Sequence, residues 1–342
     1  MSDKPYSTGN PAVDEAIARL VEQVPNHDAL LGEMITTAVK LVSDGADRGE
    51  MKLVNTTLKE MRHTFRVFRP YREIRKVSIF GSARVAVDTP VYQQAVEVAR
   101  ELALRHCMVV TGAGGGIMRA GHEGAGPDAS FGVNIRLPFE QEANDIIAGN
   151  PRLINYKYFF TRKLAFIKET DAVVVLPGGF GTHDEGFESI TLVQTGKSRI
   201  MPIIFLDAPG GLFWKAFDSY VREQLLGQGL ISAADLSLYH VTDSAVEAAQ
   251  VVETFYRRYH SMRYVGESLV VRLNPPRVEG LVQHINESFR DILRADAVES
   301  APLHAEADEP SLAHLPRLLL RFDRRHFGRL RQLIDSINNF QA

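Results

Sequence analysis

The sequence predicts an α/β protein built on a doubly wound, mostly parallel sheet. Short apolar runs that are typical of buried strands alternate with amphipathic helical patterns between about residues 71 and 265. Several of these runs end in glycine-rich loops, as expected where parallel strands end at a ligand site. We therefore expect three parts: a helical extension over 1–70, the α/β core over 71–265, and a small appendage over 266–342.

Composition narrows the class of protein. The chain has 342 residues, of which 45% are hydrophobic, and a net charge of −3, so its charge balance does not indicate a nucleic-acid or membrane partner. The single cysteine, Cys107, excludes an internal disulfide and lies in an apolar run, where a small buried side chain is expected. No signal peptide or membrane-spanning run is recognisable. We expect a soluble, cytoplasmic protein.

The helical extension shows apolar residues at helical spacing over 13–21 and 30–41, followed by a third helix expected around 51–65. Residues 1 to about 10 are polar and are expected to be disordered. The core then begins with a strand over 76–80 that ends at Gly81 and Ser82. A helix over 92–105 and a second strand over 107–111 follow. A third strand is predicted over 130–137.

A glycine loop follows the second strand and contains Gly112, Gly114, Gly115 and Gly116. It is not the dinucleotide fingerprint, because Ile117 stands where the third glycine is required and no acidic residue follows at the expected distance. The chain also lacks the glycine-lysine pattern of a P-loop. Close packing of a helix on a strand is the alternative explanation for glycines in this region.

The central stretch of the core is an apolar strand over 171–176 followed by Pro177, Gly178, Gly179 and Gly181 and then by a predicted helix from Thr182. A strand, a glycine turn and a helix N-terminus form an anion site, because free backbone N–H groups and the helix dipole point to one place. Thr182 can cap this helix, and Glu185 would complete a capping box. Glu188 lies on the same helical face. Two carboxylates beside a phosphate cradle suggest a site for a phosphorylated sugar.

The spacing of apolar residues predicts the other helices and strands of the core. A helix is predicted over 155–168, and it carries the pair Arg162 and Lys163, which on their own would indicate a solvated face. Further strands are expected over 199–206 and 238–241, with a loop and helix over 207–229 between them and a helix over 244–262 after them.

The tail contains a strand–helix pattern twice, over 269–285 and again over 318–334, and we interpret it as a duplicated β-α appendage. Between the copies, residues 295–314 are rich in Asp, Glu, Ala and Pro and are predicted to be a flexible linker. The second copy is basic, and a solvated face is favoured over a regulatory anion site. Its arginines are Arg321, Arg324, Arg325, Arg329 and Arg331.

The central motif resembles a known family. The residues from Pro177 to Glu185 match the Pro-Gly-Gly-x-Gly-Thr-x-x-Glu signature of the LOG ("Lonely guy") proteins, which are nucleotide 5′-monophosphate phosphoribohydrolases once labelled as lysine decarboxylases. The resemblance extends over about 76–242. It implies a Rossmann-like core and hydrolysis of the N-glycosidic bond of a nucleoside 5′-monophosphate, of the AMP or cytokinin type, to free base and ribose 5-phosphate.

The resemblance also assigns roles to residues. It implies that Glu185 and Arg162 are catalytic: Glu185 would stabilise an oxocarbenium-like transition state or activate water, and Arg162 would hold phosphate or aid departure of the base. The residues expected to bind substrate are Gly81, Ser82, Gly114, Gly115, Lys163, Pro177, Gly178, Gly179, Gly181, Thr182 and Glu188. No cofactor or metal is expected. LOG proteins are typically dimers or larger, so a homo-oligomer is expected.

Other functions stay open at this point. The first alternative is a non-catalytic nucleotide or phospho-ligand sensor, with the tail as its output domain. A carrier of a phosphorylated pterin-type cofactor is a second, although such a carrier would be expected to lack Glu185. A single-stranded nucleic-acid binder is disfavoured because the core lacks a basic groove pattern. Decarboxylation has no chemical support, since no Schiff-base lysine with a ring-nitrogen partner can be identified.

Overall fold

The computed structural model describes residues 6–136 and 142–341, which form two compact units that divide after Arg62. The first unit is helical, as predicted. Its third helix, expected around 51–65, extends from Arg48 to Phe68, so the division falls within this helix. These helices are α1 Pro11–Glu22, α2 Ala29–Ser43 and α3 Arg48–Phe68.

The second unit is organised around a seven-stranded sheet in which every neighbouring pair is parallel. Its order is β4-β3-β2-β1-β5-β6-β7, so the order reverses at β1, whose neighbours are β2 and β5. Ligands of such sheets lie at the carboxyl ends of the strands where the order reverses. The strands are β1 Lys76–Phe80, β2 Met108–Thr111, β3 Ser130–Ile135, β4 Leu153–Tyr156, β5 Ala172–Val175, β6 Ile203–Leu206 and β7 His240–Thr242.

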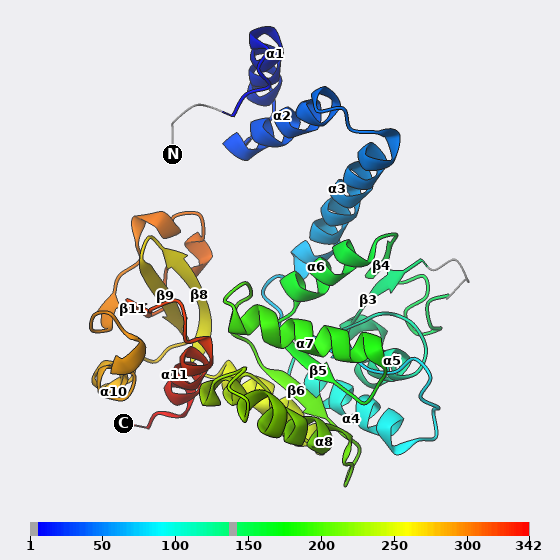
Figure 1. Ribbon diagram of the computed structural model, residues 1–342, viewed down its shortest axis with the longest axis vertical. Helices are drawn as coiled ribbons and strands as arrows, with labels where there is room; N and C mark the ends of the chain where they lie inside the picture. Colours follow the sequence, from blue (N-terminus) through cyan, green and yellow to red (C-terminus); the bar gives the residue numbers. More distant parts are fainter. Residues whose placement is uncertain (1–5, 137–141, 342) are drawn as a thin grey trace. The chain divides into compact units, whose positions relative to one another are not determined.

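Helices cover both faces of the sheet, which confirms the predicted doubly wound fold (Figure 1). Alternate side chains of a strand point to opposite faces. Val77 and Ile79 of β1 belong to one buried cluster, and Val173 and Val175 of β5 to the other. The first cluster is covered by α4 Pro90–Leu104, α5 Ile117–Ala125 and α9 Ala245–Phe255. The second is covered by α6 Phe159–Glu169, α7 Phe180–Gln194 and α8 Phe213–Tyr220.

Several element boundaries differ from the sequence prediction, and the strand predicted over 199–206, for example, begins only at Ile203. The helix predicted from residue 155 begins at Phe159, because β4 precedes it and pairs with β3. The helix predicted over 244–262 ends at Phe255, and residues from Tyr259 enter a strand. The amide side chain of Asn338 accepts hydrogen bonds from the backbone N–H groups of Arg258 and Tyr259, both at 2.9 Å, so a distant partner ends this helix. Residue 137, the predicted end of the third strand, lies outside the described residues.

The tail repeats a strand followed by a helix, as predicted, within a second sheet that is antiparallel and ordered β10-β11-β9-β8 (Figure 1, yellow to red). Leu330, Leu333 and Ile334 of its last helix belong to the same buried cluster as β5, so the tail shares the core of the larger sheet. The elements are β8 Tyr259–Val265, β9 Ser268–Leu273, α10 Leu281–Ser288, β10 Val298–Ser300, β11 Arg317–Leu320 and α11 Phe327–Asn339.

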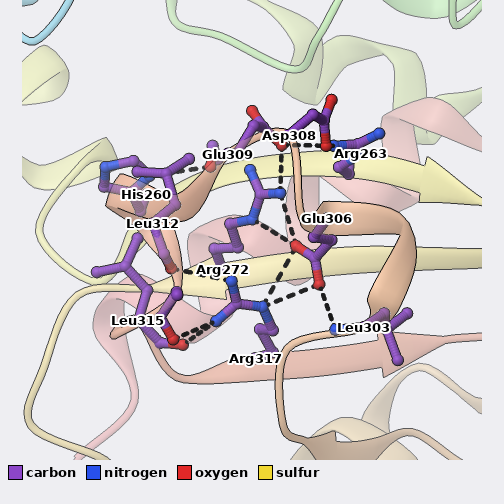
Figure 2. Close-up of polar contacts among 12 residues, drawn as sticks. His260, Arg263, Arg272, Leu303, Glu306, Asp308, Glu309, Leu312, Leu315 and Arg317 are labelled. Carbon is purple, nitrogen blue, oxygen red and sulfur yellow. Dashed lines mark hydrogen bonds and ion pairs between the residues drawn. The ribbon is translucent and has the colours of Figure 1, made fainter.

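The segment 295–314 differs from the flexible linker that its composition predicts. It contains β10 and two short 3₁₀ helices, and it carries the buried Glu306. Strands β9 and β11 place the buried Arg272 and Arg317 opposite each other, an unfavourable pairing of like charges that Glu306 and Glu309 together balance. Figure 2 shows Glu306 between the two guanidinium groups. We call Arg272, Glu306, Glu309 and Arg317 the tail cluster.

The tail arginines are not all solvated. Arg331 is buried and pairs with Asp335 at 2.9 Å, while its guanidinium lies over the ring of Phe255. Through its contact with Phe255, Arg331 therefore packs α11 against the core and does not contribute to a charged surface. Arg321, Arg324 and Arg325 are exposed, as expected. In the described part of the chain, no helix combines the length and the apolar character that crossing a bilayer requires.

Candidate functional site

A cavity of about 1110 Å³ lies where the strand order reverses. The loop after β1 contributes Gly81, Ser82 and Arg84, and the turn after β5 contributes the run from Gly178 into the first turns of α7. Gly112 follows β2, and α6 adds Arg162 and Lys163. An apolar wall completes the lining with Met118, Phe159, Phe180 and Phe213. The volume slightly exceeds the ~300–1,000 Å³ of common small-molecule sites.

Helix α7 begins earlier than the sequence predicts. Its first residue is Phe180, and Gly179 is the N-cap residue, so Thr182 lies inside the first turn and the predicted Thr182–Glu185 capping box does not form. A Cβ on Gly178 would lie 2.1 Å from the hydroxyl of Thr182, so the fold itself requires glycine there. At Gly179 and Gly181 a Cβ would meet no atom within 4 Å. Both line the cavity, where a missing side chain lets a ligand approach the backbone.

Beside this turn, α6 and α7 form a cluster of charges. The ammonium group of Lys163 lies 2.7 Å from a carboxylate oxygen of Asp184, 2.5 Å from one of Glu188 and 3.5 Å from one of Glu185. Burial alone would lower the pKa of Lys163, but the hydrogen bonds that it donates to Asp184 and Glu188 raise it, so this lysine stays charged. We call Arg162, Lys163, Asp184, Glu185 and Glu188 the cavity cluster.

Glu185 is the unusual member of the cavity cluster. Its side chain is only 14% exposed, and its Oε2 atom is buried without a hydrogen-bond partner among the described residues. Burial raises the pKa of Glu185 and the charge of Glu188 adds to this, although Lys163 and Arg162 act in the opposite direction. A carboxyl group with a raised pKa in a cavity is a candidate for acid–base chemistry.

The side chain of Arg162 is held in place by residues of β3 and α6 and by the space that a glycine leaves. Its Nε donates a hydrogen bond to the carbonyl of Val133 at 2.9 Å, and its guanidinium lies over the ring of Phe166. Gly112 makes room for it, because a Cβ there would lie 2.3 Å from its Nη2. Burial lowers the pKa of Arg162, while the charge of Glu185 opposes this shift. The guanidinium is therefore fixed close to the buried carboxyl group.

Most of the predicted site residues meet in this cavity. Those that line it are Gly81, Ser82, Arg162, Lys163, Gly178, Gly179, Gly181, Thr182 and Glu185. Four others do not line it. The carbonyl of Pro177 accepts a hydrogen bond from the N–H of Ser82, and that of Gly114 accepts one from Asn144. Gly115 lies near the carbonyl of Ala83, and Glu188 acts through Lys163.

Sequence reasoning did not single out Asp184, Arg84 or the apolar wall. Asp184 precedes Glu188 by four residues, so the helical period places both on the face that meets Lys163. Arg84 lies two residues after Ser82, in the loop at the end of β1, a position that favours a ligand contact in this class of sheet. Among the described residues, no group of three or more His, Cys, Asp or Glu side chains is arranged to hold a metal ion.

Comparisons with known proteins agree with the resemblance read from the motif. A family model described as "Possible lysine decarboxylase" matches residues 113–252. Cytokinin riboside 5′-monophosphate phosphoribohydrolase LOG2 of Arabidopsis thaliana is 23% identical over 190 residues, which cover 54% of this chain and 85% of the relative. The LOG protein of Oryza sativa subsp. japonica is 25% identical and covers 54% and 75% of the two chains. The predicted resemblance to the LOG family is thus confirmed.

Two solved structures are also similar. The X-ray structure of TM1055 is 22% identical, with a TM-score of 0.39, and covers 53% of this chain and 99% of its own. The molybdenum cofactor binding protein of Rippkaea orientalis is 17% identical, with a TM-score of 0.37, and covers 53% and 96%.

Proposed function

We propose that the protein hydrolyses the N-glycosidic bond of nucleoside 5′-monophosphates and releases free base and ribose 5-phosphate. The observation that carries the proposal is the buried, unpartnered oxygen of Glu185 at the wall of the cavity. Leaving such an atom without a partner costs free energy, and a substrate that supplies the partner explains why the cost is tolerated. The names of the LOG relatives support a nucleotide as that substrate.

In this proposal each part of the cavity has one task. The turn at Gly179 and Gly181, with Thr182, holds the 5′-phosphate at the N-terminus of α7. The binding energy of the phosphate then positions C1′ of the ribose beside Glu185. The apolar wall takes the base by stacking, which tolerates any base because every base has a π-face.

Glu185 acts as the bond to the base breaks. Positive charge then develops on the ribose ring, and the carboxylate stabilises it or removes a proton from the attacking water. Its raised pKa makes it a stronger base than an exposed glutamate. Arg162 lies close to this carboxylate and stabilises negative charge on the departing base or the phosphate.

The experiment is release of free base from a panel of nucleoside 5′-monophosphates, followed by chromatography. Glu185→Gln keeps the shape of the side chain but removes its charge, and we expect turnover to fall by about 10²–10⁴-fold. Glu287→Gln, on the exposed side of α10, is the matched control and should behave as the native protein. Full activity of Glu185→Gln would remove this residue from the chemistry.

Binding of AMP by the native protein without release of base from any nucleotide would instead favour a nucleotide sensor. The hydrolase proposal would then be abandoned, and the shared core of the tail and the sheet would be the place to seek its output.

A further inference from the structure

Three side chains with a positive charge are found among the described residues that line the cavity, namely Arg84, Arg162 and Lys163. Two of them are engaged. Lys163 contacts three carboxylates of α7, and Arg162 bonds to the carbonyl of Val133 and interacts electrostatically with Glu185. The side chain of Arg84 is exposed and makes no hydrogen bond, ion pair or ring contact with any other residue that the structure describes.

The backbone that carries Arg84 is nevertheless fixed. Its N–H donates to the hydroxyl of Ser82 at 3.1 Å, and Ser82 in turn donates its own N–H to the carbonyl of Pro177 at 3.3 Å. The carbonyl of Ser82 accepts the N–H of Ile117 at 3.1 Å. Gly116 has a φ of +57°, and a Cβ there would lie 2.3 Å from that carbonyl oxygen. The guanidinium group of Arg84, which has no partner among the described residues, is therefore carried by a hydrogen-bonded backbone at the wall of the cavity.

The cavity needs positive charge to balance a bound phosphate group. A phosphate monoester carries about −1.5 to −2 at neutral pH, and a helix N-terminus offers the equivalent of about +0.5. Lys163 adds little, because Asp184 and Glu188 already surround it with two negative charges, and the charge of Arg162 is opposed by that of Glu185. About one positive charge is still required to balance the phosphate.

We propose that Arg84 supplies this charge: it binds the 5′-phosphate and makes the cavity selective for nucleoside monophosphates over nucleosides. The inference rests on the proposed function, because it takes the ligand of this cavity to be a nucleotide. A guanidinium group suits the task, since it can donate two parallel hydrogen bonds to phosphate oxygens. Arg84 acts in binding and selectivity, while the chemistry stays with Glu185.

The test compares ligands with and without a phosphate. Binding of ribose 5-phosphate and of adenosine is measured by calorimetry on the full chain, together with kcat and KM for AMP. In Arg84→Ala we expect the Kd for ribose 5-phosphate and the KM for AMP to rise by about 10- to 100-fold, the range for losing a hydrogen bond to a charged group. The Kd for adenosine, which has no phosphate, should change by less than about twofold.

Two further variants make the test specific. Arg84→Lys keeps the charge but loses the paired geometry, so it should restore part of the affinity. Arg325→Ala, which removes an exposed arginine of the tail, should change neither constant. The inference is overturned if Arg84→Ala binds ribose 5-phosphate as tightly as the native protein, or if it weakens adenosine equally.

Failure of the proposed function would look different. If the native protein cleaves no nucleotide but binds ribose 5-phosphate, a loss of that binding in Arg84→Ala still supports the role of Arg84. If the native protein binds neither ribose 5-phosphate nor AMP, the inference is overturned together with the choice of ligand.

Discussion

The cavity cluster and the tail cluster both combine basic side chains with carboxylates, but their buried glutamates differ in how fully their oxygens are hydrogen-bonded. In the tail cluster, both oxygens of Glu306 accept hydrogen bonds, from Arg272, Arg317 and the backbone N–H of Leu303. In the cavity cluster, one oxygen of Glu185 is buried with no partner among the described residues. A cluster whose polar atoms are all hydrogen-bonded stabilises the fold. A buried oxygen without a partner is a candidate for contact with a ligand.

The pKa values follow the same contrast. Burial acts to raise the pKa of both carboxyl groups. For Glu306, the hydrogen bonds from Leu303, Arg272 and Arg317 outweigh burial, so its pKa is lowered. For Glu185, burial prevails and its pKa is raised. Removing the charge should therefore affect the stability of the protein in opposite directions at the two positions.

The largest effect is expected for Glu306→Gln. The substitution leaves the buried Arg317 without a carboxylate partner among the described residues and leaves Arg272 with Glu309 alone, which costs about 3–5 kcal/mol. The midpoint of thermal unfolding at pH 7 should fall by roughly 5–15 °C. Since the pKa of Glu306 is lowered on folding, the loss should shrink as pH falls below the unfolded value of 4.5 and on through the folded pKa.

Glu299→Gln is the matched control for this change. Glu299 lies in the same part of the tail and pairs with Arg277 at the surface, where the two side chains are 45% and 63% exposed. A surface pair of this kind contributes about 0–1 kcal/mol. A similar loss of stability in both variants would show that the enclosed position of Glu306 is not what matters.

An intermediate effect is expected on the pH dependence of catalysis. Lys163 favours the ionised form of Glu185, so Lys163→Gln should raise the pKa of this carboxyl group further. The acidic limb of the profile of kcat/KM against pH should move upward by about one pH unit. Lys168→Gln, on the same helix but 47% exposed and paired with Glu169, should leave the limb where it is. An unmoved limb in Lys163→Gln would mean that the limb does not report Glu185.

The smallest effect is a gain of stability in Glu185→Gln. A carboxyl group whose folded pKa is raised destabilises the folded protein once the pH exceeds the unfolded value of 4.5. Removing its charge should stabilise the protein by about 0.5–2 kcal/mol at pH 7–8, as is common at functional sites. The gain should disappear as the pH approaches 4.5. Destabilisation at pH 8, measured by thermal unfolding, would show that Glu185 is structurally satisfied.

The sequence predicts the residues that line the cavity better than it predicts the tail cluster, for a physical reason. In a parallel sheet, the loops after β1, β2 and β5 meet at one edge, so glycine motifs far apart in the chain converge by topology alone. The start of α7 at Phe180 was not predicted, because Gly179 occupies the N-cap position without a capping side chain. Arg84 was overlooked because a lone arginine after a Gly-Ser pair carries no periodic signal.

The order of residues 295–314 depends on pairing across the sheet. Their composition is typical of a linker, and the reason they fold is the opposition of Arg272 and Arg317 on β9 and β11. That opposition follows from the register of two strands separated by more than forty residues. The short strand β4 was missed for a related reason, since its pairing with β3 decides its conformation over the local helical pattern.

One paired measurement tests the comparison most directly: free-base release from AMP and the thermal midpoint, recorded for the native protein, Glu185→Gln and Glu306→Gln under the same conditions. We predict that Glu185→Gln loses turnover by at least about 100-fold while its midpoint stays or rises. Glu306→Gln should lose several degrees while its folded fraction keeps its turnover. Turnover retained in Glu185→Gln, or a native midpoint in Glu306→Gln, would contradict the distinction between the two clusters.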